Sequence, residues 1–253
     1  MLTTERKALI LQRLGDNGRI VAKELSQELD LSEDTIRRDL RELASEGLLQ
    51  RVHGGALPAS KALADIPTRR KISPDDKTAI AKAAAGMVKN GQIIFLDGGT
   101  TAVAVARAMP SDLLATVVTH SPEVALALHN NPGVAVELVG GRLYKHSNVA
   151  VGAVAIEAIS SIRTDVYFMG VTGIHPEHGL TTGDREEAAV KRAISRRSAE
   201  TIVLASREKL GAVSAHSVVP LIEIDGLLVA RSCPPELLEP MASLGIPITR
   251  ANG

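Results

Sequence analysis

Two arginines, Arg37 and Arg38, follow one another in a stretch whose apolar residues have helical spacing. Ile36, Leu40 and Leu43 are four and three residues apart, so they share one buried face of a helix. The arginines fall off that face and are free to meet phosphate groups or base edges. The pattern predicts the second helix of a helix-turn-helix, placed in the major groove of DNA.

The residues on either side of this helix fit the same interpretation. Ser32 is suited to cap the helix N-terminus, where the helix dipole favours the acidic side chains that follow. Gly47 ends the helix, and residues 48–56 predict two short strands around a turn, a wing that lies along the phosphate backbone. The predicted DNA-binding residues are Ser32, Asp34, Thr35, Arg37, Arg38, Arg41, Arg51 and His53.

A plain three-helix bundle is the simpler alternative, because any such bundle has apolar residues at these spacings and arginines on its solvated face. That alternative explains the leucines. It does not explain why Arg37, Arg38, Arg51 and His53 converge on one side. We therefore favour the DNA-binding interpretation.

A second candidate site follows a short apolar run that ends at Leu96. The segment Asp97–Thr101 reads Asp-Gly-Gly-Thr-Thr and leads directly into a helical pattern. Glycines let the backbone approach a ligand closely, and the amides at a helix N-terminus point outward toward an anion. Gly/Thr clusters also form plain strand-to-helix turns, so it is the position between strand and helix that predicts a phosphate-binding turn.

Length, net charge and aromatic content limit the number of domains and the kind of nucleic acid that the chain can bind. With 253 residues, of which 45% are hydrophobic, the chain is long enough for one small domain and one of ordinary size. Its formal net charge is zero, and residues 1–57 hold nine Lys/Arg against ten Asp/Glu, so DNA affinity must come from a local patch. The scarcity of aromatic residues argues against binding of single-stranded nucleic acid.

The cellular location is predicted from cysteine usage and from hydropathy. A single cysteine, Cys233, rules out an internal disulfide and fits a reducing compartment. Apolar runs fall short of the roughly 20 residues that span a bilayer, and the first residues lack the apolar core of a signal peptide. We expect a cytoplasmic protein that makes no membrane contact.

The elements that position the arginine helix are predicted to form a small winged helix-turn-helix domain over residues 1–57. Thr3 or Thr4 caps a first helix that runs to about Gly15. A second helix covers residues 20–29, and a tight turn leads from it into the arginine helix.

Residues 58–73 are predicted to be a linker, whose basic run at 69–71 forms a solvated or interdomain surface. In the α/β domain predicted over 74–253, short apolar runs alternate with helical patterns, which is typical of a parallel sheet covered on both faces. Ligands bind beyond the carboxyl ends of such strands. The expected strands are Gln92–Leu96, Ala115–Thr119, Val134–Val139, Val166–Met169, Thr201–Ala205 and Gly226–Val229, and the expected helices are Lys77–Val88, Thr101–Met109, Pro122–Asn130, Gly152–Ser161 and Glu186–Ala199.

The segment from Thr3 to Ala56 resembles the DNA-binding domain of the DeoR family of bacterial transcription regulators. A recognition helix followed by a His-Gly-Gly wing at this spacing is highly specific. The resemblance implies a winged helix-turn-helix that binds operator DNA. The residues that carry it are Asp34–Leu40, Leu43, Gly47 and Arg51–Ala56.

The resemblance continues through the second half of the chain, at Asp97–Thr101, Gly140, Gly141, Gly152, Asp165, Gly170, Gly173, Asp184, Glu187, Lys191 and Lys209. The DeoR-type sensor domain is similar in fold to ribose-5-phosphate isomerases and typically binds a phosphorylated sugar. The effector-binding residues that we predict from it are Asp97, Gly98, Gly99, Thr100, Thr101, Thr119, His120, Gly140, Gly141, Asp184, Glu187, Lys191 and Lys209.

The chain departs from the family pattern at two strand ends. Members commonly have Thr-Asn after the second strand, where this chain has Thr119 and His120, so the hydrogen-bond partner there differs. After the fifth strand many members have an aspartate, a hydroxyl residue and a lysine, whereas Ser206–Lys209 reads Ser-Arg-Glu-Lys. Only Lys209 is carried over from the family at that end.

Glu187 and Lys191 are four residues apart on one helix, which leaves two interpretations open. They form either a surface salt bridge or a clamp, in which Lys191 contacts the phosphate or a sugar hydroxyl and Glu187 contacts another hydroxyl. The segment His175–His178 is a weak metal candidate, because structural zinc takes four ligands and further ligands are not near it in sequence. We predict neither a metal nor a cofactor.

The leading hypothesis is a transcriptional repressor of a carbohydrate-metabolism operon. A phosphorylated sugar would shift a homodimer or homotetramer between states that differ in operator affinity. A sugar-phosphate isomerase or deaminase is the enzymatic alternative, but residues 165–173 hold one carboxylate, Asp165, without a general-base partner. We therefore predict no catalytic residue. An RNA-binding regulator is a third and weaker alternative.

Overall fold

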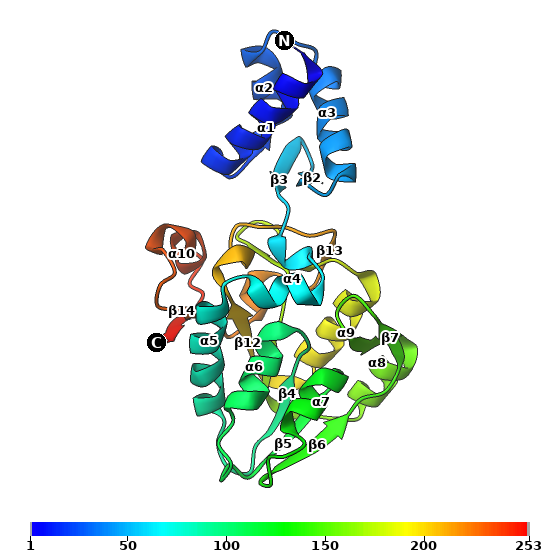
Figure 1. The fold of residues 1–253 in the computed structure, drawn as a ribbon, viewed down its shortest axis with the longest axis vertical. Coiled ribbons are helices and arrows are strands. Elements are labelled where there is room, and N and C mark those ends of the chain that lie inside the picture. The colour runs from blue at the N-terminus through cyan, green and yellow to red at the C-terminus, as the bar shows by residue number, and fades with distance from the viewer. Residues whose placement is uncertain (1, 252–253) are drawn as a thin grey trace.

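The computed structural model describes residues 2–251, which form two parts (Figure 1). The first part holds three helices and a small three-stranded sheet, and the second holds a seven-stranded sheet with helices on its faces. Strand β3 (Gly55–Pro58) leads from one part into the other. This architecture confirms the predicted winged helix-turn-helix followed by an α/β domain.

The helices of the first part are α1 (Thr3–Asn17), α2 (Ala22–Glu28) and α3 (Glu33–Ser45). The predicted threonine cap of α1 is wrong, because the N-cap is Leu2, whose N–H donates to the Glu5 carboxylate at 3.0 Å. The predicted end of α1 is also too early. The helix continues through Gly15, and Gly18, at a φ of 70°, ends it.

A small antiparallel sheet completes the first part, with β3 between β1 (Ile20–Val21) and β2 (Leu49–Val52). β2 and β3 are the predicted wing strands. Residues 20 and 21 are not the start of α2, because their extended backbone pairs with Ala56 and Gly55. Glycine is required at position 55, since a Cβ there would lie 1.8 Å from the Ile20 carbonyl oxygen.

The second part is built on a sheet whose neighbouring strands all run parallel, in the order β15-β14-β12-β9-β4-β5-β6. The strands are β4 (Ile93–Leu96), β5 (Ala115–Thr119), β6 (Val134–Leu138), β9 (Thr164–Met169), β12 (Ser198–Ala205), β14 (Gly226–Ala230) and β15 (Ile248–Ala251). All but β15 were predicted. β15 is an edge strand in which Thr249 and Arg250 are exposed, so it lacks the apolar run of the others.

Helices cover both faces of this sheet: α5 (Pro74–Met87), α6 (Thr100–Ala108), α7 (Pro122–Leu128), α8 (Ala153–Ser160), α9 (Arg185–Ser195) and α10 (Pro235–Ala242). Ile94 and Leu96 of β4 join one core with α5, α6 and α7, whereas Phe95 joins a second core with α8, α9 and α10. Because neighbouring residues of β4 enter opposite cores, the whole strand is apolar.

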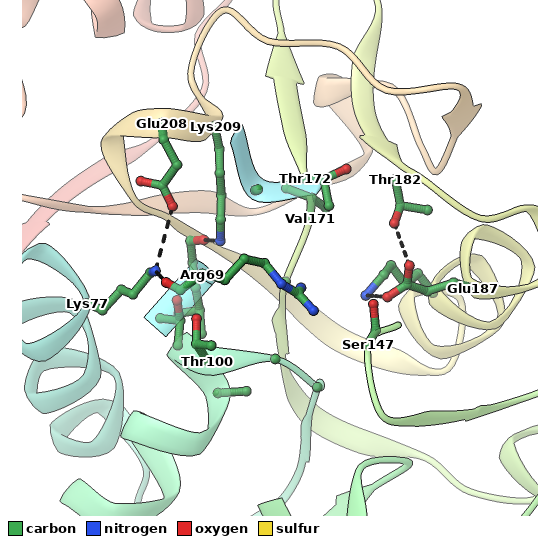
Figure 2. Close-up of a pocket in the computed structure, with 18 residues that line it drawn as sticks. Arg69, Lys77, Thr100, Ser147, Val171, Thr172, Thr182, Glu187, Glu208 and Lys209 are labelled. Atoms are coloured by element: carbon green, nitrogen blue, oxygen red, sulfur yellow. Dashed lines mark hydrogen bonds and ion pairs between the residues drawn. The ribbon is translucent and has the colours of Figure 1, made fainter. Parts of the chain in front are cut away.

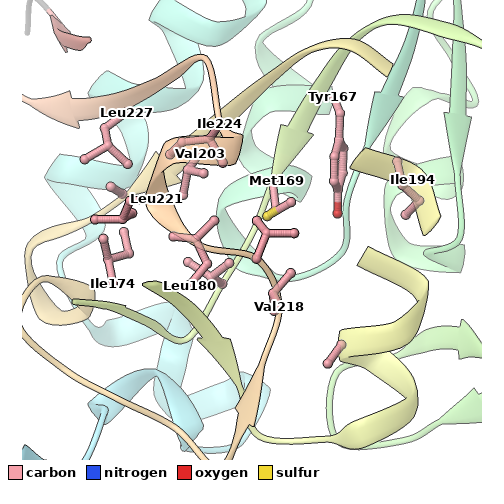
Figure 3. Packing of buried hydrophobic residues seen from close by; sticks show 14 of the residues in the cluster. Tyr167, Met169, Ile174, Leu180, Ile194, Val203, Val218, Leu221, Ile224 and Leu227 are labelled. Atoms are coloured by element: carbon pink, nitrogen blue, oxygen red, sulfur yellow. The ribbon is translucent and has the colours of Figure 1, made fainter. Parts of the chain in front are cut away.

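Short strands extend the second core, which Figure 3 shows around Tyr167, Met169 and Val203. They are β10 (Gly173–His175), β11 (Gly179–Thr182) and β13 (His216–Ser217), which form one small sheet, and the hairpin of β7 (Arg142–Tyr144) and β8 (Val149–Val151). Such strands are too short to show alternation in the sequence, so the pattern did not predict them.

Two further segments differ from the predicted pattern. α9 ends at Ser195, earlier than expected, because β12 already begins at Ser198 and pairs there with Thr164. The predicted linker contains a 3-10 turn, η1 (Lys61–Leu63), and a short helix, α4 (Ile66–Lys71). Across residues 2–251 the helices are too short or too polar to cross a membrane.

Candidate functional site

Helix α3 is held by its apolar face and by a cap at its N-terminus. Ile36, Leu40 and Leu43 are at most 2% exposed, which confirms the buried face predicted from their spacing. Ser32 accepts a hydrogen bond from the Thr35 N–H at 3.2 Å and so caps the helix as predicted. The opposite face of α3 is left to solvent.

That solvent face carries the three predicted arginines, Arg37, Arg38 and Arg41. Arg37 Nη2 lies 2.7 Å from Glu33 Oε1, one turn earlier on the helix. This hydrogen bond and the charge of Glu33 raise the pKa of Arg37. Asp34 is exposed at the start of the same helix. The face therefore combines fixed positive charge with polar side chains at the helix N-terminus.

The wing adds two exposed side chains, Arg51 on β2 and His53 in the turn that follows. A small groove runs between α3 and the wing, and Arg37 and Arg51 line it together with Gly54. The structure thus brings the recognition helix and the wing together at one surface, although the two arginines come from different elements.

A buried ion pair that the sequence pattern did not reveal holds α3 against α1. Arg6 and Asp39 are 5% and 0% exposed, and two nitrogens of the Arg6 guanidinium bond to the Asp39 carboxylate. The hydrogen bond to Asp39 raises the pKa of Arg6 despite its burial. Asp39 follows directly after exposed arginines, so neither spacing nor composition marks it as buried.

The second part has a cavity at the carboxyl ends of β4, β9 and β12, where ligands bind in parallel α/β sheets (Figure 2). Segments far apart in the sequence contribute its polar wall, including the turn after β4, the start of α9 and the 3-10 turn η2 (Arg207–Lys209). The lining residues are Ala62, Arg69, Lys77, Gly98, Gly99, Thr100, Thr101, Ala102, Ser147, Gly170, Val171, Thr172, Thr182, Glu187, Lys191, Leu204, Glu208 and Lys209.

The N-terminus of α6 opens into this cavity. Gly99 is the N-cap, at a φ of 94°, and it has no side chain to accept from the amides of the first turn. A Cβ at Gly98 would lie 2.2 Å from Val149 Cγ1, so this position has no room for a side chain. Uncapped amides and the helix dipole together favour an anion at this end of the cavity.

Asp97 lies beneath the cavity and is fully buried, with both carboxylate oxygens occupied. His120 Nε2 lies 2.8 Å from Oδ1, and Tyr167 Oη and Lys191 Nζ lie 2.8 and 2.7 Å from Oδ2. Backbone amides of residues 98 and 170 also donate to it. Burial alone would raise the pKa of Asp97, but the charge of Lys191 and the contact with His120 hold it well below its usual range.

Glu187 and Lys191 lie inside the molecule, which excludes a surface salt bridge. Lys191 Nζ is 3.5 Å from Glu187 Oε1, and the Thr182 hydroxyl donates to Glu187 Oε2 at 2.6 Å. Burial lowers the pKa of Lys191, but the charges of Asp97 and Glu187 outweigh it and raise that pKa overall. One end of the cavity therefore carries a fixed carboxylate and ammonium.

The other end carries Lys209, Lys77 and Glu208. Lys209 Nζ donates to the Leu204 carbonyl at 2.9 Å, and burial lowers the pKa of Lys209 to about 8. Lys77 Nζ lies 4.0 Å from Glu208 Oε1, and burial lowers the pKa of Lys77 as well. Among the residues described, nothing bonds to Glu208 Oε2, although it is buried. This end of the cavity therefore offers ammonium donors and a carboxylate acceptor to a polar ligand.

The predicted effector residues divide into two groups. Those that line the cavity are Gly98, Gly99, Thr100, Thr101, Glu187, Lys191 and Lys209. Asp97, Thr119, His120, Gly140, Gly141 and Asp184 do not line it. Thr119 and His120 are buried, and the Thr119 hydroxyl accepts from the Ser121 N–H at 3.1 Å. Asp184 caps α9, and Gly140 and Gly141 lie between β6 and β7.

The effector-binding residues predicted from the family resemblance leave out several side chains that line the cavity: Arg69, Lys77, Ser147, Thr172, Thr182 and Glu208. Arg69 belongs to the basic run that we expected to be a solvated or interdomain surface. The sequence Thr-Thr-Gly-Asp at residues 181–184, just before α9, indicates a loop over the cavity, and Thr182 lines it. Lys77 and Ser147 reach the cavity only through the packing of their elements.

The His175–His178 segment does not form a metal site. The rings of His175 and His178 have centroids 4.9 Å apart, and burial lowers the pKa of His175. Among residues 2–251, His, Cys, Asp and Glu side chains do not gather in groups of three or more that suit a metal ion.

A winged helix-turn-helix with exposed arginines, joined to an α/β domain with a polar cavity at the carboxyl ends of its strands, defines a class: DNA-binding regulators with a sensor domain. The chain belongs to the DeoR family of transcriptional regulators. Residues 6–62 match the family model of the DeoR-like helix-turn-helix domain, and residues 72–230 match that of the DeoR C terminal sensor domain.

The relatives are named as regulators. The HTH-type transcriptional regulator GolR of Listeria innocua is 33% identical over 254 residues, which cover 100% of both chains. The glycerol-3-phosphate regulon repressor of Escherichia coli is 32% identical over 212 residues, covering 83% of this chain and 84% of that one. As a member of this family the chain is a transcriptional regulator, and these relatives are named as regulators, not as enzymes. Among solved structures, ribose 5-phosphate isomerase A from Methanocaldococcus jannaschii is similar over 54% of each chain, with 18% identity and a TM-score of 0.40.

Proposed function

We propose that this protein represses a carbohydrate-metabolism operon and that a phosphorylated sugar, bound in the cavity, controls its affinity for operator DNA. The observation that carries the proposal is the convergence of an uncapped helix N-terminus and buried cations on one cavity. A name among the relatives, the glycerol-3-phosphate regulon repressor, is consistent with this ligand class.

At the DNA, α3 enters the major groove with Arg37, Arg38 and Arg41 toward phosphates and base edges. Arg51 and His53 of the wing follow the adjacent backbone, which positions the helix. The groove that Arg37 and Arg51 line together supports contact of both elements with one duplex. Ser32, Asp34 and Thr35 lie at the N-terminal end of α3, the end from which a recognition helix contacts base edges.

At the effector, the phosphate accepts from the amides of residues 99–101 at the start of α6. Lys209, beside this turn, supplies an ammonium group for the same phosphate. Both partners are fixed before the ligand arrives, so little ordering is needed on binding. Lys77 adds positive charge behind them.

The sugar end of the effector lies against α9. Glu187 Oε1 accepts from a sugar hydroxyl, and Lys191 donates to another. Ser147 and Thr182 line the same end and offer further hydroxyl groups. A ligand with a phosphate at one end and several hydroxyls at the other satisfies both ends of the cavity.

Two copies of α3 are needed to read a symmetric operator, because recognition helices work on paired half-sites. We therefore propose a homodimer or homotetramer. Sedimentation of the full chain with and without operator DNA measures this directly.

A ligand screen with a DNA-binding assay tests the whole proposal. Phosphorylated sugars are screened by the shift of the unfolding temperature, because a ligand that binds the folded state raises it by mass action. Each hit is then added to the protein bound to a duplex from its own promoter region, followed by fluorescence anisotropy. We expect one sugar phosphate to change the Kd for DNA. A protein that ignores every such duplex, or that turns over the sugar phosphate, contradicts the proposal.

The variant Lys209→Met isolates the cavity from the DNA surface. We expect it to lose the response to the sugar phosphate and to keep the wild-type Kd for DNA. Arg107→Met is the matched control, because Arg107 is an exposed cation near the far end of α6. An unchanged Kd for the sugar phosphate in Lys209→Met would remove the phosphate assignment.

A further inference from the structure

Residues 59–72, which we call the connector, link the wing to α5 and are docked on the second part of the chain. Ala59 forms a parallel bridge with Val213. The buried Ser60 hydroxyl donates to the carbonyl oxygen of Thr172, a residue that lines the cavity. β3 ends at Pro58, directly before the connector, so no flexible residues separate the wing from the contacts of Ala59 and Ser60.

The far end of the connector is held as well. The Lys77 ammonium, which lines the cavity, donates to the carbonyl oxygens of Arg69 and Ile72 at the end of α4. Ile66, at the start of α4, is 8% exposed. The connector is therefore held to the second part at both ends and through the buried Ala62 and Ile66, and is part of the sensor structure.

The connector also supplies one wall of the cavity, through Ala62 and Arg69. Figure 2 shows the Arg69 side chain extending between the end with Lys209 and the end with Glu187. A Cβ built on Gly99 would lie 3.9 Å from Arg69 Nη1. The guanidinium thus lies over the N-terminus of α6, where the phosphate is expected.

Arg69 has unused hydrogen-bonding capacity at this place. Its Nη2 donates to the His146 carbonyl at 2.9 Å, while its buried Nε meets no acceptor among the described residues. Burial lowers the pKa of Arg69, and the nearby charge of Glu187 opposes that effect. A buried donor without a partner costs free energy until an acceptor arrives, and an anion between Arg69 and α6 supplies one.

We propose that Arg69 binds the effector phosphate together with the α6 amides, and that the connector carries the occupancy of the cavity to the wing. The inference rests on the proposed function, since it assumes that a phosphorylated ligand binds at the N-terminus of α6. It adds a ligand contact from outside the α/β core and a route to the DNA-binding part.

The route follows from differential affinity. An effector that bonds to Arg69 only when the connector is docked binds that docked state more tightly and so increases its population. Because β3 continues into the connector, docking fixes where the wing begins relative to the cavity. Effector binding then changes the Kd for DNA without a contact between effector and DNA.

Inorganic phosphate and the full-length protein test the ligand contact. Arg69→Gln is compared with Arg70→Gln, since Arg70 is on the same short helix but is exposed and pairs with Glu123 at 3.3 Å. We expect Arg69→Gln to raise the Kd for phosphate at least about tenfold, the size of a hydrogen-bonded charge contact, and Arg70→Gln to leave it within about twofold. Equal values of Kd in the two variants overturn the inference.

Hydrogen exchange of the same samples tests the route. We expect phosphate to slow amide exchange in residues 61–72 and in β3 of the wild type. Ser60→Ala removes the hydrogen bond to the Thr172 carbonyl, which lies outside the expected phosphate site at the N-terminus of α6. In this variant we expect phosphate still to slow amide exchange in α6 but no longer in β3. Phosphate binding without protection of the connector overturns the inference and leaves the cavity assignment intact. A wild type that binds neither phosphate nor any sugar phosphate overturns the proposed function itself.

Discussion

The two parts of this protein carry their charged groups in opposite ways. The arginines of α3 and the wing are exposed to solvent, whereas the ionic groups that line the cavity are buried or partly buried. Exposed charges suit a large polyanion, which brings its own field and releases counterions on binding. Buried charges suit a small ligand, because fixed partners hold them in place and water is largely excluded.

Each part also contains a fully buried aspartate that pairs with a cation, and the two aspartates differ in their surroundings. Arg6 and Asp39 bond to each other between two helices. Asp97, by contrast, bonds to Lys191, His120, Tyr167 and two backbone amides at once. The first pair fixes the orientation of one helix, while the second joins several strand ends beneath the cavity, so its loss should be felt more widely.

Asp97→Asn is the largest expected perturbation. It leaves the Lys191 ammonium buried without its main counterion, and we expect the second part to lose about 3–5 kcal/mol of stability. Both tyrosines of the chain lie in that part, so tyrosine fluorescence during urea unfolding follows it alone. Asp112→Asn, at an exposed position, is the control. An equal loss in the first part, measured by hydrogen exchange in α1, would break the comparison.

The double variant Arg37→Ala, Arg38→Ala tests the exposed charges. We expect the Kd for operator DNA to rise at least about a hundredfold and the slope of log K against log salt to shrink by about two. The Kd for the sugar phosphate should stay at its wild-type value. Arg13→Ala is the matched control. Arg13 is on α1 and pairs with Glu28 on α2, so it does not belong to the exposed face of α3. Undiminished DNA binding in the double variant would refute the role of α3.

The pH dependence of effector binding tests the buried charges. The pKa of Lys209, lowered by burial to about 8, means that the ammonium loses its proton above that pH in the empty cavity. The charged side chains that face Lys209 are Lys77, Arg69, Lys191 and Glu208. Of these, only the Glu208 carboxylate opposes the loss of the Lys209 proton.

A bound phosphate retains that proton, so we expect affinity to fall by up to about tenfold per pH unit above pH 8. Affinity also falls below about pH 6, where the phosphate gains a proton. Calorimetry from pH 5 to 10 measures both limbs. In Lys209→Met the upper limb should be absent, and its persistence would show that another group is responsible.

Ser32→Ala has the smallest expected effect. It removes the acceptor of the Thr35 N–H, so α3 should lose about 1 kcal/mol of stability. Faster amide exchange in the first turn of α3, with unchanged exchange in α9, would sharpen the contrast between the two parts. The exposed Ser45→Ala, at the other end of α3, is the control.

The helix and wing that form the proposed DNA-binding surface were predictable because their residues are close in the sequence. Ser32, Leu40 and Arg51 were placed by helix periodicity, capping preference and a short strand pattern, all of which act over a few residues. The strands of the parallel sheet other than β15 were predictable as well, because each is a short continuous apolar run. Arg6 and Asp39 were not, because their pairing depends on how α1 crosses α3.

The cavity depended far more on the tertiary structure. The sequence by itself determined the Gly-Gly-Thr-Thr turn after β4 and the Glu187 and Lys191 pair on α9. Only the tertiary structure decided that Lys191 bonds to Asp97, 94 residues away in the sequence. It also decided that Arg69, alone among the basic residues 69–71, lines the cavity. The physical reason is that burial and charge pairing between distant segments follow from packing, and packing leaves no periodic trace in the chain.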